Sequence, residues 1–161
     1  MKTLVLIRHG KSSWEHPISD MHRPLKPRGI SDAKLVSEAF LKSGFIPDLV
    51  VSSPAKRALD TCKVFIKKMG ISDKKIQINP TIYDFGGGKT SDFIKSIGNN
   101  YQKVILFGHN HAFTALANLF GSIYIENLPT SGLVMISFDV NSWRDIEKGT
   151  TELVLFPKNL K

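Results

Sequence analysis

The chain has 161 residues, of which 42% are hydrophobic and 22% are charged. These fractions are typical of a globular protein and exclude a disordered chain, and the length suits one domain, which we expect to span residues 1–161. The apolar runs are far shorter than the roughly 20 residues that cross a bilayer, and the N-terminal stretch MKTLVLIRHG has no signal-peptide cleavage site. We therefore expect a cytoplasmic protein that does not enter a membrane.

The charge and the cysteine content restrict the class of partner and the compartment. The formal net charge is +8 at pH 7, which favours anionic partners such as phosphorylated groups, acidic proteins or nucleic acid. No aromatic residues are interleaved with Lys67, Lys68, Lys74 and Lys75, as a single-strand binding groove requires, so we expect no nucleic-acid partner. Cys62 is the single cysteine, so an internal disulfide is impossible and nothing indicates an oxidising compartment.

Short apolar runs alternate with helical periodicity along the chain, which predicts an α/β fold with a mostly parallel sheet. The sixth predicted strand, together with the fifth, is also compatible with a hairpin at one edge of the sheet. The predicted strands cover residues 3–7, 48–52, 76–79, 103–107, 133–138 and 152–156.

Helix signals follow the first two strands and recur later in the chain. Ser31 is the predicted N-cap of a helix that stops at Gly44. Ser53 is the predicted cap of the next helix, with Pro54 at its first position, and its apolar stripe includes Cys62, which we expect to be buried and inert. Shorter helices are predicted over residues 91–97 and 112–120.

The stretch DFGGGKTSD, residues 84–92, resembles a phosphate-binding loop only in part. A P-loop requires a glycine five positions before its last glycine, and Tyr83 stands there. The stretch also fails as a dinucleotide fingerprint because Ser91 stands where the third glycine belongs. We interpret the triple glycine as a mobile loop.

The histidines raise the question of a metal site. Arg8 directly precedes His9, and a fixed cation beside a divalent metal is unfavourable. No histidine pair has the spacing of a helical His-Glu-x-x-His motif. We therefore expect no metal site among the five histidines, which are His9, His16, His22, His109 and His111, or the nearby Asp20 and Asp84.

The residues directly after three predicted strands share one chemistry. Ligands of open α/β sheets bind beyond the carboxyl ends of the strands, so these residues are candidates for a site. Each position offers a group that binds or attacks an anion. The three groups are Arg8, His9, Gly10 and Lys11; then Ser52, Ser53, Pro54 and Arg57; then Gly108, His109, Asn110 and His111.

Arg57 and the two histidines favour a site over isolated structural residues. Arg57 is expected in the first turn of its helix, where the helix dipole disfavours a cation unless an anion also binds there. Neutral imidazole is a good nucleophile, and an arginine beside it holds a phosphoryl group and balances its charge. We expect Gly10 to let the backbone approach the ligand closely.

Four segments in the order LIRHGKSSW, RPLKPRG, SSPAKRALDTC and FGHNHAF resemble the histidine phosphatase superfamily. The resemblance is closest to its small phosphohistidine phosphatase branch, the SixA type. It implies a phosphoglycerate mutase-like fold, a single three-layer α/β/α domain without a sizeable lid insertion.

The resemblance also implies a two-step displacement without metal or organic cofactor. His9 attacks phosphorus and forms a phosphohistidine, while Arg8, Arg57 and His109 bind the phosphoryl oxygens. Water then releases phosphate. Lys11 and Ser12 are expected to line the pocket, and Asn110 and Gly10 to contact substrate.

Asp84 is the candidate general acid, because the superfamily commonly supplies a carboxylic acid from another strand end. An ordinary turn aspartate before glycine is an equal alternative. The phosphohistidine branch lacks a well-matched acid, which suits a leaving nitrogen that is easily protonated. Two residues depart from the family: Lys11 replaces an acidic residue that is typical of mutases, and His111 replaces a frequent proline.

The intervals between the four segments are short, so we expect a shallow, open site that suits a phosphorylated side chain on another protein. The preferred substrate is a phosphohistidine in a phosphotransfer or histidine-kinase type protein. A small-molecule phosphomonoesterase is the second hypothesis, and a non-catalytic phosphate-binding module is the third.

Overall fold

The computed structural model describes residues 1–15 and 17–161, so the histidine at position 16 lies outside the described residues. The strands are β1 (Lys2–Arg8), β2 (Leu49–Ser52), β3 (Ile76–Ile78), β4 (Lys103–Gly108), β5 (Leu133–Phe138) and β6 (Thr150–Leu155). The α-helices of the described residues are α1 (Pro27–Leu41), α2 (Lys56–Lys68), α3 (Gly88–Lys95) and α4 (Ala112–Phe120). Short 3-10 turns are η1 (Asp20–His22), η2 (Asp73–Lys75), η3 (Pro80–Ile82), η4 (Trp143–Asp145) and η5 (Pro157–Asn159).

The strands form one sheet in the order β3-β2-β4-β1-β5-β6. The first four strands in this order are parallel to one another. β5 is antiparallel to both β1 and β6. The mostly parallel sheet and the edge hairpin of the last two strands are therefore confirmed.

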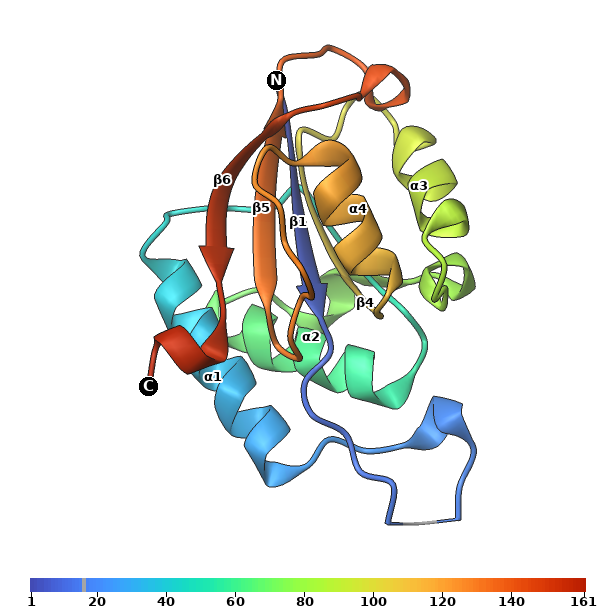
Figure 1. Ribbon diagram of the computed structural model, residues 1–161, viewed down its shortest axis with the longest axis vertical. Helices are drawn as coiled ribbons and strands as arrows, with labels where there is room; N and C mark the ends of the chain where they lie inside the picture. Colours follow the sequence, from blue (N-terminus) through green and yellow to red (C-terminus); the bar gives the residue numbers. More distant parts are fainter. Residues whose placement is uncertain (16) are drawn as a thin grey trace.

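Helices cover both faces of the sheet, which gives a three-layer α/β/α domain (Figure 1). In β1, Leu4 and Leu6 pack with α3 and α4, whereas Val5 and Ile7 pack with α1 and α2. This alternation follows from the two-residue period of a strand that is buried on both sides. Cys62 lies among the residues that pack between the sheet and the helices α1 and α2, and it is fully buried. Burial raises the pKa of its thiol. The prediction of a buried cysteine is therefore correct.

The predicted starts of the first two helices are wrong. α1 begins at Pro27, four residues before Ser31, because proline has the backbone angle of a first helical residue and the helix extends back to it. α2 begins at Lys56 instead of Pro54. The Ser53 hydroxyl does not cap α2, because it accepts from the Ala55 amide and pairs with a histidine of the candidate site.

The triple-glycine stretch, predicted as a mobile loop, also differs from its prediction. α3 begins at Gly88 instead of residue 91, and Gly87 is its N-cap with a φ of 104°. The stretch is thus a turn that leads directly into a helix, held by hydrogen bonds to Asp84. Glycine is favoured at this N-cap because its φ is positive.

The connection between β1 and α1 is held at its two ends. The Ser13 amide donates to Pro24 O at 2.8 Å, and the Lys26 amide donates to Lys11 O at 2.8 Å. A Cβ on Gly29 would lie 2.3 Å from Lys11 O, so this pairing requires glycine. In Figure 1 the connection extends beyond the carboxyl end of β1.

Within the described residues, none of the helices combines the length and the apolar character needed to cross a membrane.

Candidate active site

The register of the two central strands brings the predicted histidines together. Arg8, the last residue of β1, is paired with Gly108, the last residue of β4. His9 and His109 each follow directly, and their ring centroids are 5.4 Å apart. Two residues separated by 100 positions in the chain are therefore neighbours because their strands are adjacent, parallel and in register.

Two contacts define the tautomer of His9. Its Nδ1 lies 2.7 Å from Gly10 O, an acceptor, so Nδ1 carries the proton. Arg57 Nε–H points at His9 Nε2 at 3.4 Å, and a guanidinium is always a donor. Nε2 therefore carries no proton, and its in-plane electron pair accepts this hydrogen bond.

The surroundings of His9 keep its ring neutral. The side chain is 7% exposed, and burial lowers its pKa to about 3. The nearby His109, Arg57 and Arg8 act in the same direction, while the Gly10 carbonyl acts against it. A neutral imidazole at physiological pH is the state that a nucleophile requires.

Arg57 extends from the first turn of α2 into the site, between His9 and Asp20. Its side chain is 2% exposed and forms an ion pair with Asp20 Oδ2 at 2.9 Å. Arg57 Nη1 also donates to Asp20 O at 2.7 Å. The sequence predicted that an anion accompanies this arginine, and the structure shows a carboxylate of the chain itself in that place.

Asp20 also connects Arg57 to two further side chains. Its carboxylate accepts from Arg23 Nε at 3.1 Å and from Tyr83 Oη at 2.5 Å. Burial raises the pKa of Asp20, but the hydrogen bonds from Tyr83, Arg57 and Arg23 outweigh it and hold this pKa below its usual range. Asp20 is thus a fixed negative charge that competes with any other anion for Arg57.

Arg23 has a defined position on the other side of the pocket. Its Nη1 donates to Ser12 Oγ at 2.8 Å, and its guanidinium lies 3.4 Å from the centroid of the Trp14 ring. Such a cation–π contact together with hydrogen bonds limits the motion of the side chain. Trp14 itself remains 74% exposed, so the aromatic ring is available to a ligand or partner.

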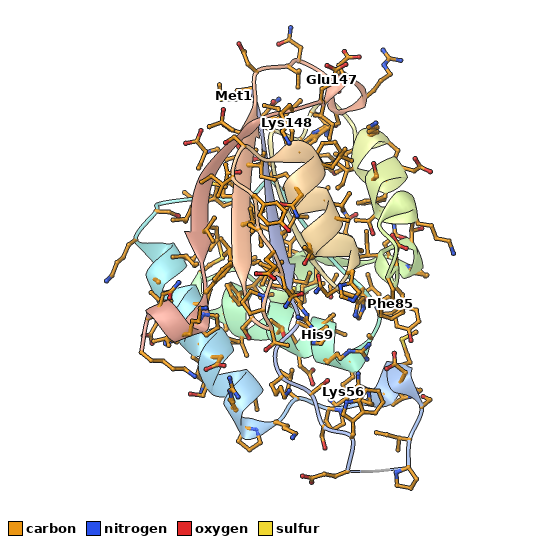
Figure 2. The ribbon with its side chains drawn as sticks, in the orientation of Figure 1. Met1, His9, Lys56, Phe85, Glu147 and Lys148 are labelled. Atoms are coloured by element: carbon orange, nitrogen blue, oxygen red, sulfur yellow. The ribbon has the colours of Figure 1, made fainter. Side chains whose placement is uncertain are left out.

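These side chains enclose an open pocket of about 330 Å³ at the carboxyl end of β1. Figure 2 shows His9 and Phe85 at this end of the sheet. The predicted residues that line the pocket are Arg8, His9, Lys11, Ser12, Arg57 and Asn110. The lining residues without a predicted role are Trp14, Asp20, Arg23, Phe85 and Thr130.

Arg8 faces the pocket from the end of β1. Its Nη1 donates to Leu128 O at 2.8 Å, whereas its buried Nε has no hydrogen-bond partner in the described part of the chain. Burial, followed by the proximity of Arg57, lowers the pKa of Arg8. A buried, unpaired donor beside a second arginine is suited to an anionic ligand.

His109 is close to His9 but is more enclosed than predicted. It is fully buried, does not line the pocket, and its Nε2 lies 2.8 Å from Ser53 Oγ. Burial lowers its pKa to about 3, with Arg57 acting in the same direction. The role of His109 in binding phosphoryl oxygens stays a prediction.

Gly10 has a packing role in the structure, and its contact with substrate stays a prediction. It does not line the pocket, and its amide donates to Thr61 Oγ1 at 2.9 Å. A Cβ at Gly10 would lie 2.9 Å from Gly29 O. Gly10 therefore permits close packing against the start of α1, which fixes the backbone that carries His9.

The contacts of Asp84 favour the turn alternative over the general acid. Its carboxylate accepts from the amides of Gly86, Gly87 and Thr90 and from Thr90 Oγ1, with distances of 3.3, 3.1, 3.0 and 3.0 Å. It does not line the pocket. Burial acts against ionisation, but the bonds from Thr90, Gly86 and Gly87 lower the pKa of Asp84, which is unsuitable for a proton donor near neutral pH.

The residues missed by the sequence analysis had weak local signals. Arg23 lies in the segment RPLKPRG, and Trp14 ends the segment LIRHGKSSW, but neither residue has a chemical pattern of its own. Asp20 was considered only as a metal ligand. Among residues 1–15 and 17–161, no three or more histidine, cysteine, aspartate or glutamate side chains are grouped as metal ligands.

Comparison with known proteins identifies the family. The sequence matches the histidine phosphatase superfamily (branch 1) over residues 4–103. The chain belongs to this superfamily. An uncharacterized protein of Mycobacterium tuberculosis is 31% identical over 160 residues, which cover 93% of this chain and 98% of that protein. An uncharacterized chloroplastic protein of Arabidopsis thaliana is 27% identical over 153 residues, which cover 89% of this chain and 70% of that protein.

Solved structures place this histidine phosphatase with the SixA type. The crystal structure of SixA from Agrobacterium tumefaciens superposes with a TM-score of 0.80 at 25% identity, covering 97% of this chain and 98% of that chain. The protein histidine phosphatase SixA in complex with tungstate has the same fold, with a TM-score of 0.79 at 20% identity and 99% coverage of both chains. The phosphoglycerate mutase-like fold is therefore confirmed.

Proposed function

We propose that this histidine phosphatase hydrolyses the phosphoryl group from a phosphorylated histidine of a partner protein through a covalent phospho-His9 intermediate. The observation that carries the proposal is the unprotonated His9 Nε2, whose electron pair accepts a long hydrogen bond from Arg57 Nε at 3.4 Å. A nucleophile placed against an arginine is suited to attack a phosphorus atom whose oxygens the same arginine binds.

The first step forms one bond and breaks one bond. Arg57 Nε–H turns from His9 Nε2 to the phosphoryl oxygens as substrate binds, which frees the electron pair of Nε2. This pair attacks phosphorus, and the phosphorus–nitrogen bond to the substrate imidazole breaks. The leaving nitrogen keeps the bonding electrons and takes a proton from water. In the second step water attacks phosphorus, the bond to Nε2 breaks, and inorganic phosphate leaves.

The arginines supply the positive charge for both steps. Arg8, Arg23 and Arg57 all line the pocket, and arginine matches the geometry of phosphoryl oxygens with paired donors. This charge balances the phosphoryl oxygens, so the proposed reaction is independent of a metal ion. The tungstate complex of SixA, which holds a tetrahedral oxyanion, supports an oxyanion as the ligand.

A phosphohistidine fits the site better than a phosphate ester for two reasons. The exposed rings of Trp14 and Phe85, 74% and 46% exposed, provide aromatic surface beside the pocket for the ring that carries the phosphoryl group. The leaving nitrogen of a phosphoramidate needs less acid assistance than an ester oxygen, and the carboxyl group of Asp84 is engaged by the start of α3.

The test is a direct trap of the intermediate. Metal-free protein is mixed with a peptide that contains phosphohistidine with a radioactive phosphoryl group, and the reaction is stopped by alkaline denaturation. We expect label on the wild type and on His22→Gln, which changes an exposed histidine, and no label on His9→Gln.

Three results oppose the proposal. Label on His9→Gln excludes His9 as the nucleophile. Preferred turnover of sugar phosphates or nucleotides supports the small-molecule phosphomonoesterase. Tight phosphate binding without hydrolysis of any phosphorylated compound supports the binding module.

A further inference from the structure

A groove with lysines on its sides runs along the packed helices α1 and α2. It consists of two hollows of about 580 and 400 Å³. They adjoin, because Lys63 and Val64 line both. We call this surface the α1–α2 groove; the residues used below to define it are Leu25, Ile30, Val64, Lys34, Lys63 and Lys67.

The groove combines apolar surface with uncompensated positive charge. Leu25 and Val64 are half-buried and Ile30 is 40% exposed. Two other lysines at the groove have ion-pair partners, since Lys56 pairs with Asp60 at 2.9 Å and Lys68 pairs with Glu38 at 2.8 Å.

Three lysines of the groove have no such partner. Lys34, Lys63 and Lys67 are exposed, and within the described residues none of them forms an ion pair. Their like charges repel one another, so an acidic ligand is favoured at this surface.

The groove reaches the active site at one end. Pro24 and Lys56 line it, and these residues are the direct chain neighbours of Arg23 and Arg57, which line the catalytic pocket. Figure 2 shows Lys56 at the same end of the molecule as His9. A chain whose phosphorylated residue occupies the pocket can therefore continue into the groove.

We propose that the α1–α2 groove docks an acidic segment of the phosphorylated protein substrate, next to the phosphohistidine in the pocket. This inference rests on the proposed function and adds the recognition of the residues around the phosphorylated one. The apolar residues of the groove contact the aliphatic parts of the bound segment. Lys34, Lys63 and Lys67 pair with its carboxylates.

The geometry of α2 predicts how far the carboxylates of the bound segment lie from its phosphohistidine. Lys63 and Lys67 follow Arg57 by six and ten residues in α2, which corresponds to about 9 and 15 Å along the axis. An extended peptide covers about 3.3 Å per residue, so its acidic residues lie about three and five positions from the phosphohistidine.

The experiment compares two synthetic peptides that carry one phosphohistidine. One has glutamate three and five positions away on both sides, and the other has glutamine there. The readout is the ratio of kcat/KM for the two peptides, measured at low and at high salt. Because each variant is compared with itself, a change in its overall activity cancels from the ratio.

Wild type is expected to prefer the glutamate peptide by about fivefold at low salt, with the preference falling at high salt. The variant Lys63→Glu/Lys67→Glu is expected to lose the preference. The matched control is Lys95→Glu/Lys148→Glu, which makes the same charge change outside the groove and is expected to keep the preference. Thermal unfolding monitors the fold of each variant.

The outcomes separate this inference from the proposed function. If wild type hydrolyses neither peptide, the proposed function fails and the docking inference fails with it. If wild type hydrolyses both peptides without preference, or if the groove variant keeps the preference, only the docking inference fails. It also fails if the groove variant loses binding of a 20-residue oligonucleotide but keeps the peptide ratio, because the groove is then a nucleic-acid site.

Discussion

Replacing Asp20 by asparagine tests whether this carboxylate competes with the phosphoryl group for the arginines of the pocket. In the structure Asp20 pairs with Arg57 Nη2 at 2.9 Å and with Arg23 Nε at 3.1 Å. Asparagine has nearly the same shape and keeps one oxygen as an acceptor. The change thus removes one negative charge from the pocket with little change in packing.

The expected gain in anion affinity follows from Coulomb's law. Two unit charges 4 Å apart interact by about 1 kcal/mol in water, and a phosphoryl dianion doubles this value. The Asp20 side chain is 38% exposed, so solvent and salt screen the interaction and about 1 to 1.5 kcal/mol remains. This corresponds to about tenfold tighter binding of inorganic phosphate by Asp20→Asn.

The assay measures the inhibition constant of inorganic phosphate against turnover at low and at high salt. The difference between wild type and Asp20→Asn is expected to shrink as salt increases. Asp139→Asn, which removes an exposed aspartate just beyond the end of β5, is the control and is expected to match wild type. An unchanged or weaker phosphate inhibition of Asp20→Asn at low salt would refute the competition.

Three further predictions concern the protonation of His9, the pH dependence of stability and the start of α3. NMR of the His9 imidazole nitrogens between pH 4.5 and 8 is expected to show a neutral ring at pH 5 with the proton on Nδ1, because the pKa of His9 is lowered to about 3. A doubly protonated His9 ring at pH 5 would contradict this protonation state. The pKa values of His9 and His109 are near 6.5 in the unfolded chain and about 3 in the folded chain. The unfolded chain therefore binds more protons below pH 6.5, so the free energy of unfolding, measured by urea titration, is expected to fall as pH decreases below about 6.5. Asp84→Asn is expected to lower that free energy by about 1 kcal/mol, because the amide replaces an acceptor oxygen at the start of α3. It is also expected to change kcat/KM equally for an aryl and an alkyl phosphate; a selective loss on the alkyl phosphate restores the general-acid role.

The local patterns of the sequence predict most of the fold. Every predicted strand is present within two residues of its expected bounds, and the last helix, Ala112–Phe120, is correct at both ends. Strand and helix periodicity depend on neighbouring residues, so they are visible in one sequence. The helix starts at Ser31 and Ser53 are wrong because capping depends on where the side chain finds a partner, and Ser53 pairs with His109, which directly follows β4.

The sequence also predicts only part of the candidate site. The order of the motifs indicates His9, Arg8 and Arg57, and the structure places all three around one pocket. The partners that define their state were not predicted. Asp20 and Arg57 are 37 residues apart, and Asp20 and Tyr83 are 63 residues apart, so no local pattern links them.

Residue order alone specifies the class of fold, the family and the chemical types of the groups at the strand ends. Only the folded structure shows the strand register that places His9 beside His109, the tautomer of His9 and the carboxylate that pairs with Arg57. The physical reason is that hydrogen bonds and charge interactions act over a few ångströms in space, regardless of how many residues separate the groups along the chain.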